Sequence, residues 1–147
     1  MIKLKKGTTK FLLDTNVFIA AIKNSKKETK TLSLILKMIE SENIHLIGDE
    51  FLVEEMIRYA EEFNSETSSW ILRAILEKME IVEVGDNYVK ICKNYIKTPN
   101  LADIIPAAAC LKSDATLITN DSHFNKIRDE GIIRVLSISK MINELLI

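Results

Sequence analysis

The sequence of 147 residues contains little cysteine, glycine or proline. Its two cysteines, Cys92 and Cys110, form no CxxC pair, so we expect neither a disulfide framework nor a cysteine-based zinc site. Four glycines and two prolines exclude collagen-like and low-complexity chains. The glycines are isolated from one another, which excludes a glycine-rich loop that cradles phosphate.

Long hydrophobic runs and an excess of one charge are also missing. No segment reaches the roughly 18 apolar residues of a membrane span. Residues 1–6 resemble the charged start of a signal peptide, but Asp14, Thr15 and Asn16 interrupt the apolar run that would have to follow. Lys and Arg total 20 against 21 Asp and Glu, which argues against nucleic-acid binding through bulk positive charge. We expect a cytoplasmic protein with reduced thiols and no membrane association.

The charges are distributed unevenly along the chain. Residues 1–30 hold eight lysines against Asp14 and Glu28, a local surplus of six positive charges. We interpret this surplus either as a solvated lysine surface or as an edge that faces phosphate groups. The lysines concerned are Lys3, Lys5, Lys6, Lys10, Lys23, Lys26, Lys27 and Lys30.

Short apolar runs alternate with segments of helical periodicity. The runs predict strands at residues 11–13, 45–47, 81–84, 115–119 and 132–136. Helices are expected at residues 17–22, 49–64, 66–78, 86–92, 101–111, 122–129 and 138–145. One more helix is expected to begin after a cap at residue 29, 31 or 33. This alternation favours a mostly parallel sheet covered on both faces. We expect a single α/β domain over residues 1–147 with about five strands.

Two aspartates follow predicted strands. Asp14 comes directly after the strand at residues 11–13, and Asp121 follows the strand at residues 115–119. Because sites in parallel sheets form outside the carboxyl ends of the strands, both side chains are expected at the same rim. A helix cap or a turn is the alternative role for either aspartate alone.

Asp103 is a third candidate acid, in the first turn of the helix predicted at residues 101–111. The eight residues that follow it contain no polar side chain, so this helix is expected to be buried. An acid at the positive end of a helix is favoured by the helix dipole, so capping alone is the alternative.

Helical phase separates Glu55 from its neighbour Glu54. Glu54 falls on the polar face with Arg58, whereas Glu55 falls inside the apolar stripe. That stripe consists of Leu52, Met56, Tyr59 and Phe63. A carboxylate facing the core is unfavourable unless a cation or metal compensates it, which makes Glu55 the anomalous acid. An ion pair with Arg73 is the alternative.

The four acids Asp14, Glu55, Asp103 and Asp121 therefore come from separate segments, and at least three are expected near one sheet edge. Like charges so close together repel one another unless a cation lies between them. Oxygen ligands suit Mg²⁺ or Mn²⁺. The pattern indicates metal-assisted hydrolysis of a phosphodiester.

Four motifs carry a resemblance to a known family. They are FLLDTNVF at residues 11–18, Glu55-Met56, Asp103 before IIPAAA, and LITNDSHF at residues 117–124. Together they resemble the PIN-domain ribonuclease family, which includes the toxin nucleases of toxin/antitoxin pairs, over about residues 10–136. Pro106 departs from the family pattern, because a proline there removes a backbone donor and can kink the helix that carries Asp103.

The resemblance implies a three-layer α/β/α sandwich and Mg²⁺- or Mn²⁺-dependent cleavage of single-stranded RNA. It assigns catalytic and metal-binding roles to Asp14, Glu55, Asp103 and Asp121. Thr119 matches a hydroxyl residue that lines the same site, and Asn16 matches a polar residue beside the first aspartate.

The resemblance also implies partners. A toxin would have a small antitoxin across its acidic site, and related proteins commonly form homodimers. The expected docking surface is residues 49–78, where Phe51, Ile57, Trp70 and Ile71 offer more apolar positions than one core face needs. Trp70, Tyr59 and Phe63 are interpreted as core residues, with a partner surface as the alternative.

Other functions stay open. The chain could be an RNA-processing nuclease that is not a toxin, or a degenerate PIN fold that binds protein or RNA. Phosphatases with an aspartyl nucleophile place a second aspartate two residues after the first, where this chain has Asn16. His45 and His123 lack metal-ligand spacing and are expected to be structural or exposed.

Overall fold

The computed structural model describes residues 9–23 and 29–145. Five of the eight N-terminal lysines lie outside the described residues, and so does most of the phosphate-facing edge expected there. These are Lys3, Lys5, Lys6, Lys26 and Lys27.

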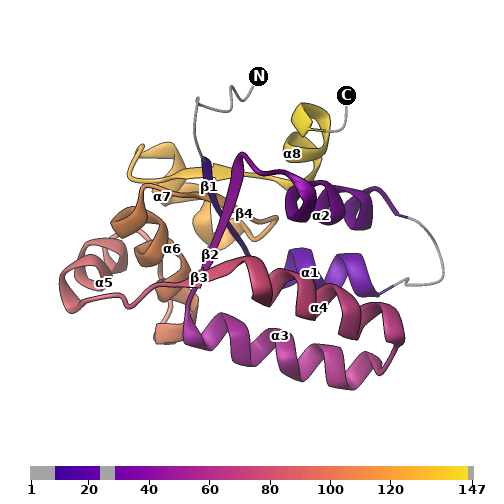
Figure 1. Ribbon diagram of the computed structural model, residues 1–147. Helices are drawn as coiled ribbons and strands as arrows, with labels where there is room; N and C mark the ends of the chain where they lie inside the picture. Colours follow the sequence, from indigo (N-terminus) through magenta and orange to yellow (C-terminus); the bar gives the residue numbers. More distant parts are fainter. Residues whose placement is uncertain (1–8, 24–28, 146–147) are drawn as a thin grey trace.

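Within the described residues, five parallel strands form one sheet in the order β3-β2-β1-β4-β5 (Figure 1). They are β1 (Thr9–Leu13), β2 (Ile44–Gly48), β3 (Met79–Ile81), β4 (Thr116–Ile118) and β5 (Arg134–Leu136). In the central strand β1, Phe11 is paired with Leu46 of β2 and with Thr116 of β4. The apolar run of β1 is fully buried because helices cover both faces of the sheet.

The helices form two layers, one on each face of the sheet (Figure 1). One layer holds α1 (Thr15–Ile22), α2 (Lys30–Glu40), α3 (Glu50–Phe63), α4 (Glu66–Lys78) and α8 (Ile138–Leu145). The other holds α5 (Asp86–Lys93), α6 (Leu101–Ser113) and α7 (Asn125–Asp129). Right-handed crossover connections explain this division. The connections from β1 to β2 and from β2 to β3 run in one direction across the sheet, whereas those from β3 to β4 and from β4 to β5 run in the other, so their helices lie on opposite faces. The predicted three-layer α/β/α sandwich is confirmed.

Two strands lie away from their predicted positions. Strand β3 was expected at residues 81–84 but begins at Met79, directly after α4 ends at Lys78. The Lys78 ammonium donates to the carbonyl oxygens of Met38, Ile39 and Ser41 at 2.7–3.0 Å, which ties this junction to the end of α2. Strand β5 begins at residue 134 instead of 132, because the Ile132 N–H donates to the Ile127 carbonyl in the preceding turn.

The helix predicted at residues 122–129 is divided into a short 3₁₀ turn, Ser122–Phe124, and α7. The cause is local, because the Asp121 carboxylate accepts from the His123 N–H and closes a tighter turn. Polar side chains cap several other helices, whereas α1 and α5 begin without a hydrogen bond from a capping side chain. Thr29, of the three candidates, caps α2, and Asp49 and Ser65 cap α3 and α4.

The interpretation of Trp70 and Phe63 as core residues is wrong. Trp70 is 57% exposed and Phe63 is 39% exposed. Ile71 and Ile75 form the buried face of α4, and Trp70 is turned away from it by one position of the helix. Among the described residues, no helix has both the length and the apolar character needed to cross a membrane.

Candidate active site

The side chains of Asp14, Glu55, Asp103 and Asp121 line a small pocket at the carboxyl edge of the sheet. The pocket has a volume of about 140 Å³, and Asn16 is also part of its lining. It lies where α3 of one helical layer approaches α6 of the other. The topology therefore brings together four acids that are distributed over more than 100 positions of the chain.

Asp14 is held by the pairing of β1 with β4. Its backbone N–H donates to the Ile118 carbonyl at 3.0 Å. The buried hydroxyl of Thr119 donates to Asp14 Oδ2 at 2.7 Å and accepts from the Asp121 N–H at 3.0 Å. Thr119 does not line the pocket itself, so its geometric role is to orient Asp14 and the Asp121 backbone.

Asp121 is held by its own turn. Its Oδ1 accepts from the His123 N–H at 2.9 Å and lies 3.0 Å from His123 Nδ1. The His123 side chain is 60% exposed, so the expectation of an exposed histidine is confirmed, and it also touches a candidate site residue. Both contacts are made by Oδ1 of the carboxylate.

Asp103 is positioned by the start of α6. Asn100 caps this helix through the Ala102 N–H at 3.1 Å, and the Thr98 hydroxyl donates to Asp103 Oδ2 at 3.1 Å. The helix continues through Pro106, which itself lines the pocket. The departure at Pro106 therefore does not interrupt the helix that carries Asp103.

Glu55 reaches the pocket from α3, whereas Glu54 is exposed. The helical phase read from the sequence thus agrees with the structure on which glutamate faces the other acids. Arg73, the alternative partner for Glu55, is exposed and lines a different hollow. Burial raises the pKa of Glu55, and the charge of Asp14 raises it further.

The electrostatics of the pocket oppose ionisation of Asp14. Burial is the largest cause of its raised pKa, and the charges of Asp121 and Asp103 act in the same direction. The hydrogen bonds from the Thr119 hydroxyl and the Thr15 N–H only partly compensate. A bound cation would remove this conflict by offsetting the clustered negative charge.

The donor chemistry of the pocket fits a hard divalent cation. All four acids offer oxygen, and the buried Thr15 hydroxyl, which also lines the pocket, is without a hydrogen-bond partner among the described residues. Within residues 9–23 and 29–145, no group of three or more His, Cys, Asp or Glu side chains is close enough to hold an ion as it stands. The arrangement therefore suits an ion such as Mg²⁺, which keeps several of its waters.

Asp49 is a buried acid that sequence reasoning treated only as a helix start. It follows β2 just as Asp14 follows β1, and it is 2% exposed. Its Oδ1 accepts from the Leu52 N–H at 3.0 Å, while Oδ2 has no partner in the part of the chain that the structure describes. Burial raises the pKa of Asp49, yet this residue does not line the acidic pocket. An aspartate directly after a strand therefore does not by itself show whether the residue caps a helix or belongs to the site.

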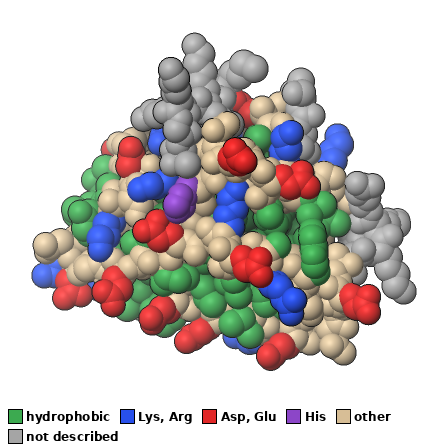
Figure 2. All heavy atoms as spheres, in the orientation of Figure 1, with side chains coloured by type: hydrophobic (Ala, Val, Ile, Leu, Met, Phe, Trp, Pro, Cys, Tyr) green, Lys and Arg blue, Asp and Glu red, His purple; other side chains and the backbone are tan. Residues whose placement is uncertain are grey.

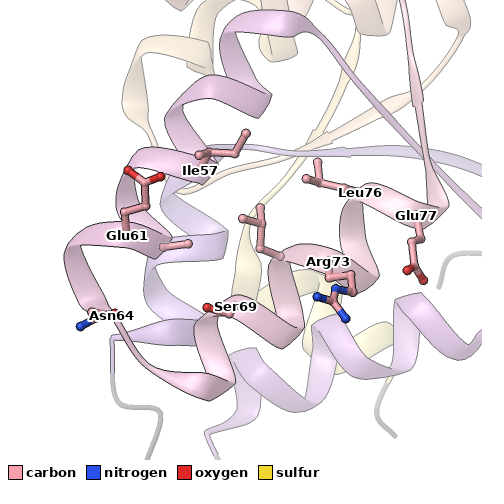
Figure 3. Close-up of a pocket in the computed structure, with 9 residues that line it drawn as sticks. Ile57, Glu61, Asn64, Ser69, Arg73, Leu76 and Glu77 are labelled. Carbon is pink, nitrogen blue, oxygen red and sulfur yellow. The ribbon is translucent and has the colours of Figure 1, made fainter.

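A second hollow lies between α3 and α4 (Figure 3). It has a volume of about 570 Å³, with Ile57, Leu72 and Leu76 in its walls. Glu61, Glu77 and Arg73 stand around it. Figure 2 shows hydrophobic side chains exposed between acidic ones on the lower part of the molecule, where Figure 1 places α3.

The PIN-domain family model matches residues 11–130, which include all four acids. The chain belongs to the PIN-domain family. Members of this family are generally nucleases that use divalent metal ions. The resemblance read from the sequence motifs is thus confirmed at the level of the family.

Solved structures support the same fold for this PIN domain. VapBC2 from Rickettsia felis, bound to a promoter DNA fragment, is 18% identical over 88% of this chain and 98% of its own, with a TM-score of 0.62. VapBC-1 from nontypeable Haemophilus influenzae is 22% identical over 90% of this chain and 100% of its own, with a TM-score of 0.60. FitAcB from Neisseria gonorrhoeae is 19% identical over 88% and 98%, also with a TM-score of 0.60. None of the curated proteins compared with this PIN domain matches it in sequence.

Asp14→Asn is expected to stabilise the metal-free protein at pH 8. Because the folded-state pKa of Asp14 lies above its ordinary value of 3.8, its contribution to stability is full below that value and is lost as pH rises through the folded pKa. We expect a gain of about 1 kcal/mol, or about 2–4 °C in Tm, that shrinks towards pH 4. Thermal unfolding in a chelating buffer measures this.

Glu54→Gln is the matched control, because it also neutralises one acid but changes an exposed side chain on α3. It should leave Tm nearly unchanged at both pH values. A lower Tm for Asp14→Asn than for wild type at pH 8 would contradict the electrostatic conflict described for this pocket.

Proposed function

We propose that this PIN domain is an Mg²⁺- or Mn²⁺-dependent endoribonuclease that cleaves single-stranded RNA by hydrolysis and acts as the toxin of a toxin/antitoxin pair. The observation that carries the proposal is the convergence of Asp14, Glu55, Asp103 and Asp121 on one pocket. Their oxygen donors and mutual repulsion suit divalent cations that also bind the scissile phosphate.

The chain's own residues would divide the work as follows. Asp14, Glu55, Asp103 and Asp121 would hold the metal, directly or through water. When bound, the metal supplies Lewis acidity, a water of lowered pKa and charge neutralisation at the leaving oxygen. Thr119 keeps the Asp14 carboxylate aimed through its 2.7 Å hydrogen bond. Products with 5′-phosphate and 3′-hydroxyl ends are expected.

The dimensions of the pocket favour a phosphate over a larger group. At about 140 Å³ it is smaller than the roughly 300–1,000 Å³ of sites that enclose whole small molecules. A phosphate with its ions can enter, while the attached nucleosides remain outside.

The first test compares cleavage of single-stranded RNA by wild type and Asp14→Asn in Mn²⁺. The variant removes one charged ligand, so kcat/KM should fall by about 100-fold or more. Glu54→Gln, purified in the same way, should keep wild-type activity, and a chelator should abolish cleavage by both active proteins.

Equal cleavage by wild type and Asp14→Asn would overturn the proposal, because it would place the activity elsewhere or in a contaminant. If the wild type cleaved no RNA at any metal concentration, a degenerate PIN fold that binds protein or RNA would become the better reading. Cleavage without toxicity in cells would favour the RNA-processing nuclease.

The proposal includes a small antitoxin partner. The similar solved structures come from VapBC and FitAB antitoxin complexes. On this chain the hollow between α3 and α4 offers apolar walls, with Glu61 and Glu77 beside them (Figure 3). An amphipathic segment with basic residues would match both features. The expected homodimer also stays a prediction.

Ile57→Glu is expected to weaken binding of the adjacent gene's product by about tenfold or more, because it places a charge in the apolar wall of the hollow. Ile57 is 38% exposed, so the fold should tolerate the change. Ile91→Glu is the matched control, since Ile91 is 43% exposed but lies on α5 in the other layer. Calorimetry with the purified partner measures both. Equal weakening by the two variants would exclude this hollow as the docking surface.

A further inference from the structure

The acidic pocket is small compared with sites that enclose a whole nucleotide. Its volume of about 140 Å³ admits a phosphate, whereas sites that enclose whole small molecules start at about 300 Å³. An RNA strand would therefore lie over the rim, and the side chains there decide what the strand meets. That the bound strand is RNA rests on the proposed function.

Tyr59 forms part of that rim. It lies one helical turn beyond Glu55 on α3, so both side chains project from the same side of the helix. Tyr59 is one of the residues that line the pocket, and its side chain packs partly against the core. A ring that is partly buried at the mouth of a polar pocket is a fixed apolar surface beside the acids.

Arg58 is held on this ring. The guanidinium carbon lies 5.0 Å from the centre of the Tyr59 ring, within the range of a cation–π contact. The residue is exposed, so the guanidinium remains open to solvent above the ring. Arg58 lies three residues after Glu55 on α3, a spacing that makes the two side chains neighbours on the helix surface, so its positive charge lies beside the acids.

A guanidinium in this position has two uses for a nucleic acid. Its plane can stack on an unpaired base, and its N–H groups can donate to a phosphate oxygen. Contact with the ring restricts the flexible side chain in advance, so less conformational entropy is lost on binding. The pair therefore supplies both a stacking surface and a positive charge at the edge of an otherwise acidic pocket.

We propose that Arg58 and Tyr59 form a platform that binds the nucleotide next to the scissile phosphate of single-stranded RNA. The Tyr59 ring supports the guanidinium, and the guanidinium stacks on the base. A base within a duplex is already stacked and paired, so the platform favours unpaired strands. It contacts the substrate without holding the metal.

The test is binding of a fluorescein-labelled single-stranded RNA of about 12 nucleotides, followed by anisotropy in Ca²⁺. Arg58→Lys keeps the charge but loses the planar group, and Tyr59→Leu removes the support. Each should raise Kd by about 5- to 100-fold, the value of one base stacking interaction. Tyr59→Phe keeps the ring and should bind within about twofold of wild type.

Arg128→Lys is the matched control, because it makes the same change at an exposed arginine that pairs with Asp129 on α7. It should leave Kd unchanged. In cleavage assays with Mn²⁺, Arg58→Lys should raise KM and leave kcat nearly unchanged. Tyr59→Leu is used only if its unfolding remains cooperative, and Arg58→Lys carries the test if it does not.

Two outcomes overturn the platform. The first is equal binding by Arg58→Lys and Arg128→Lys, which would mean that Arg58 contributes only its positive charge and no stacking. The second is equal Kd values for single-stranded and fully duplex RNA in the wild type. Failure of the proposed nuclease function is distinguishable, because it would appear as equal cleavage by wild type and Asp14→Asn. The anisotropy measurement does not depend on cleavage.

Discussion

The hydrogen bond from the Thr119 hydroxyl to Asp14 is the interaction on which the candidate site depends. It joins the ends of β1 and β4, the central strand and its neighbour, and the same hydroxyl accepts from the Asp121 N–H. One buried side chain thus positions two acids from segments about a hundred residues apart. Asp14 and Asp121 follow two buried strands, whereas Glu55 and Asp103 are carried by helices, so the candidate site is built mainly on regular secondary structure.

This arrangement is unfavourable without a cation. Burial and neighbouring acids raise the pKa of Asp14, and burial raises that of Glu55. Sites that carry such strain are tolerated when the rest of the fold supplies enough stability. In this chain the apolar runs of β1 and β4 and the buried segment of α6 after Asp103 contribute to that stability. The near-neutral net charge of the chain therefore conceals an acidic pocket, with the Arg58 guanidinium at its rim.

Much of this was predictable from the sequence, because strand ends and helical phase follow simple periodicities. Strand ends placed Asp14 and Asp121 at one edge of the sheet, and helical phase separated Glu55 from Glu54. The start of β3 at Met79 was not predictable, because it depends on Lys78 reaching the end of α2, nearly forty residues away in sequence. Trp70 was misjudged because its exposure depends on tertiary packing. Asp49 was overlooked as a buried acid because its burial also depends on tertiary packing. The contact of Arg58 with the Tyr59 ring is a rotamer choice that sequence spacing does not specify.

In the proposed function, the Thr119 hydroxyl orients a group of carboxylates that binds a divalent cation. Calorimetric titration of Mn²⁺ into wild type and Thr119→Val tests it most directly, since valine keeps the shape but loses the hydroxyl. We expect wild type to bind Mn²⁺ and the variant to bind it at least about tenfold more weakly. Equal affinities, or no binding of Mn²⁺ by the wild type, would contradict it.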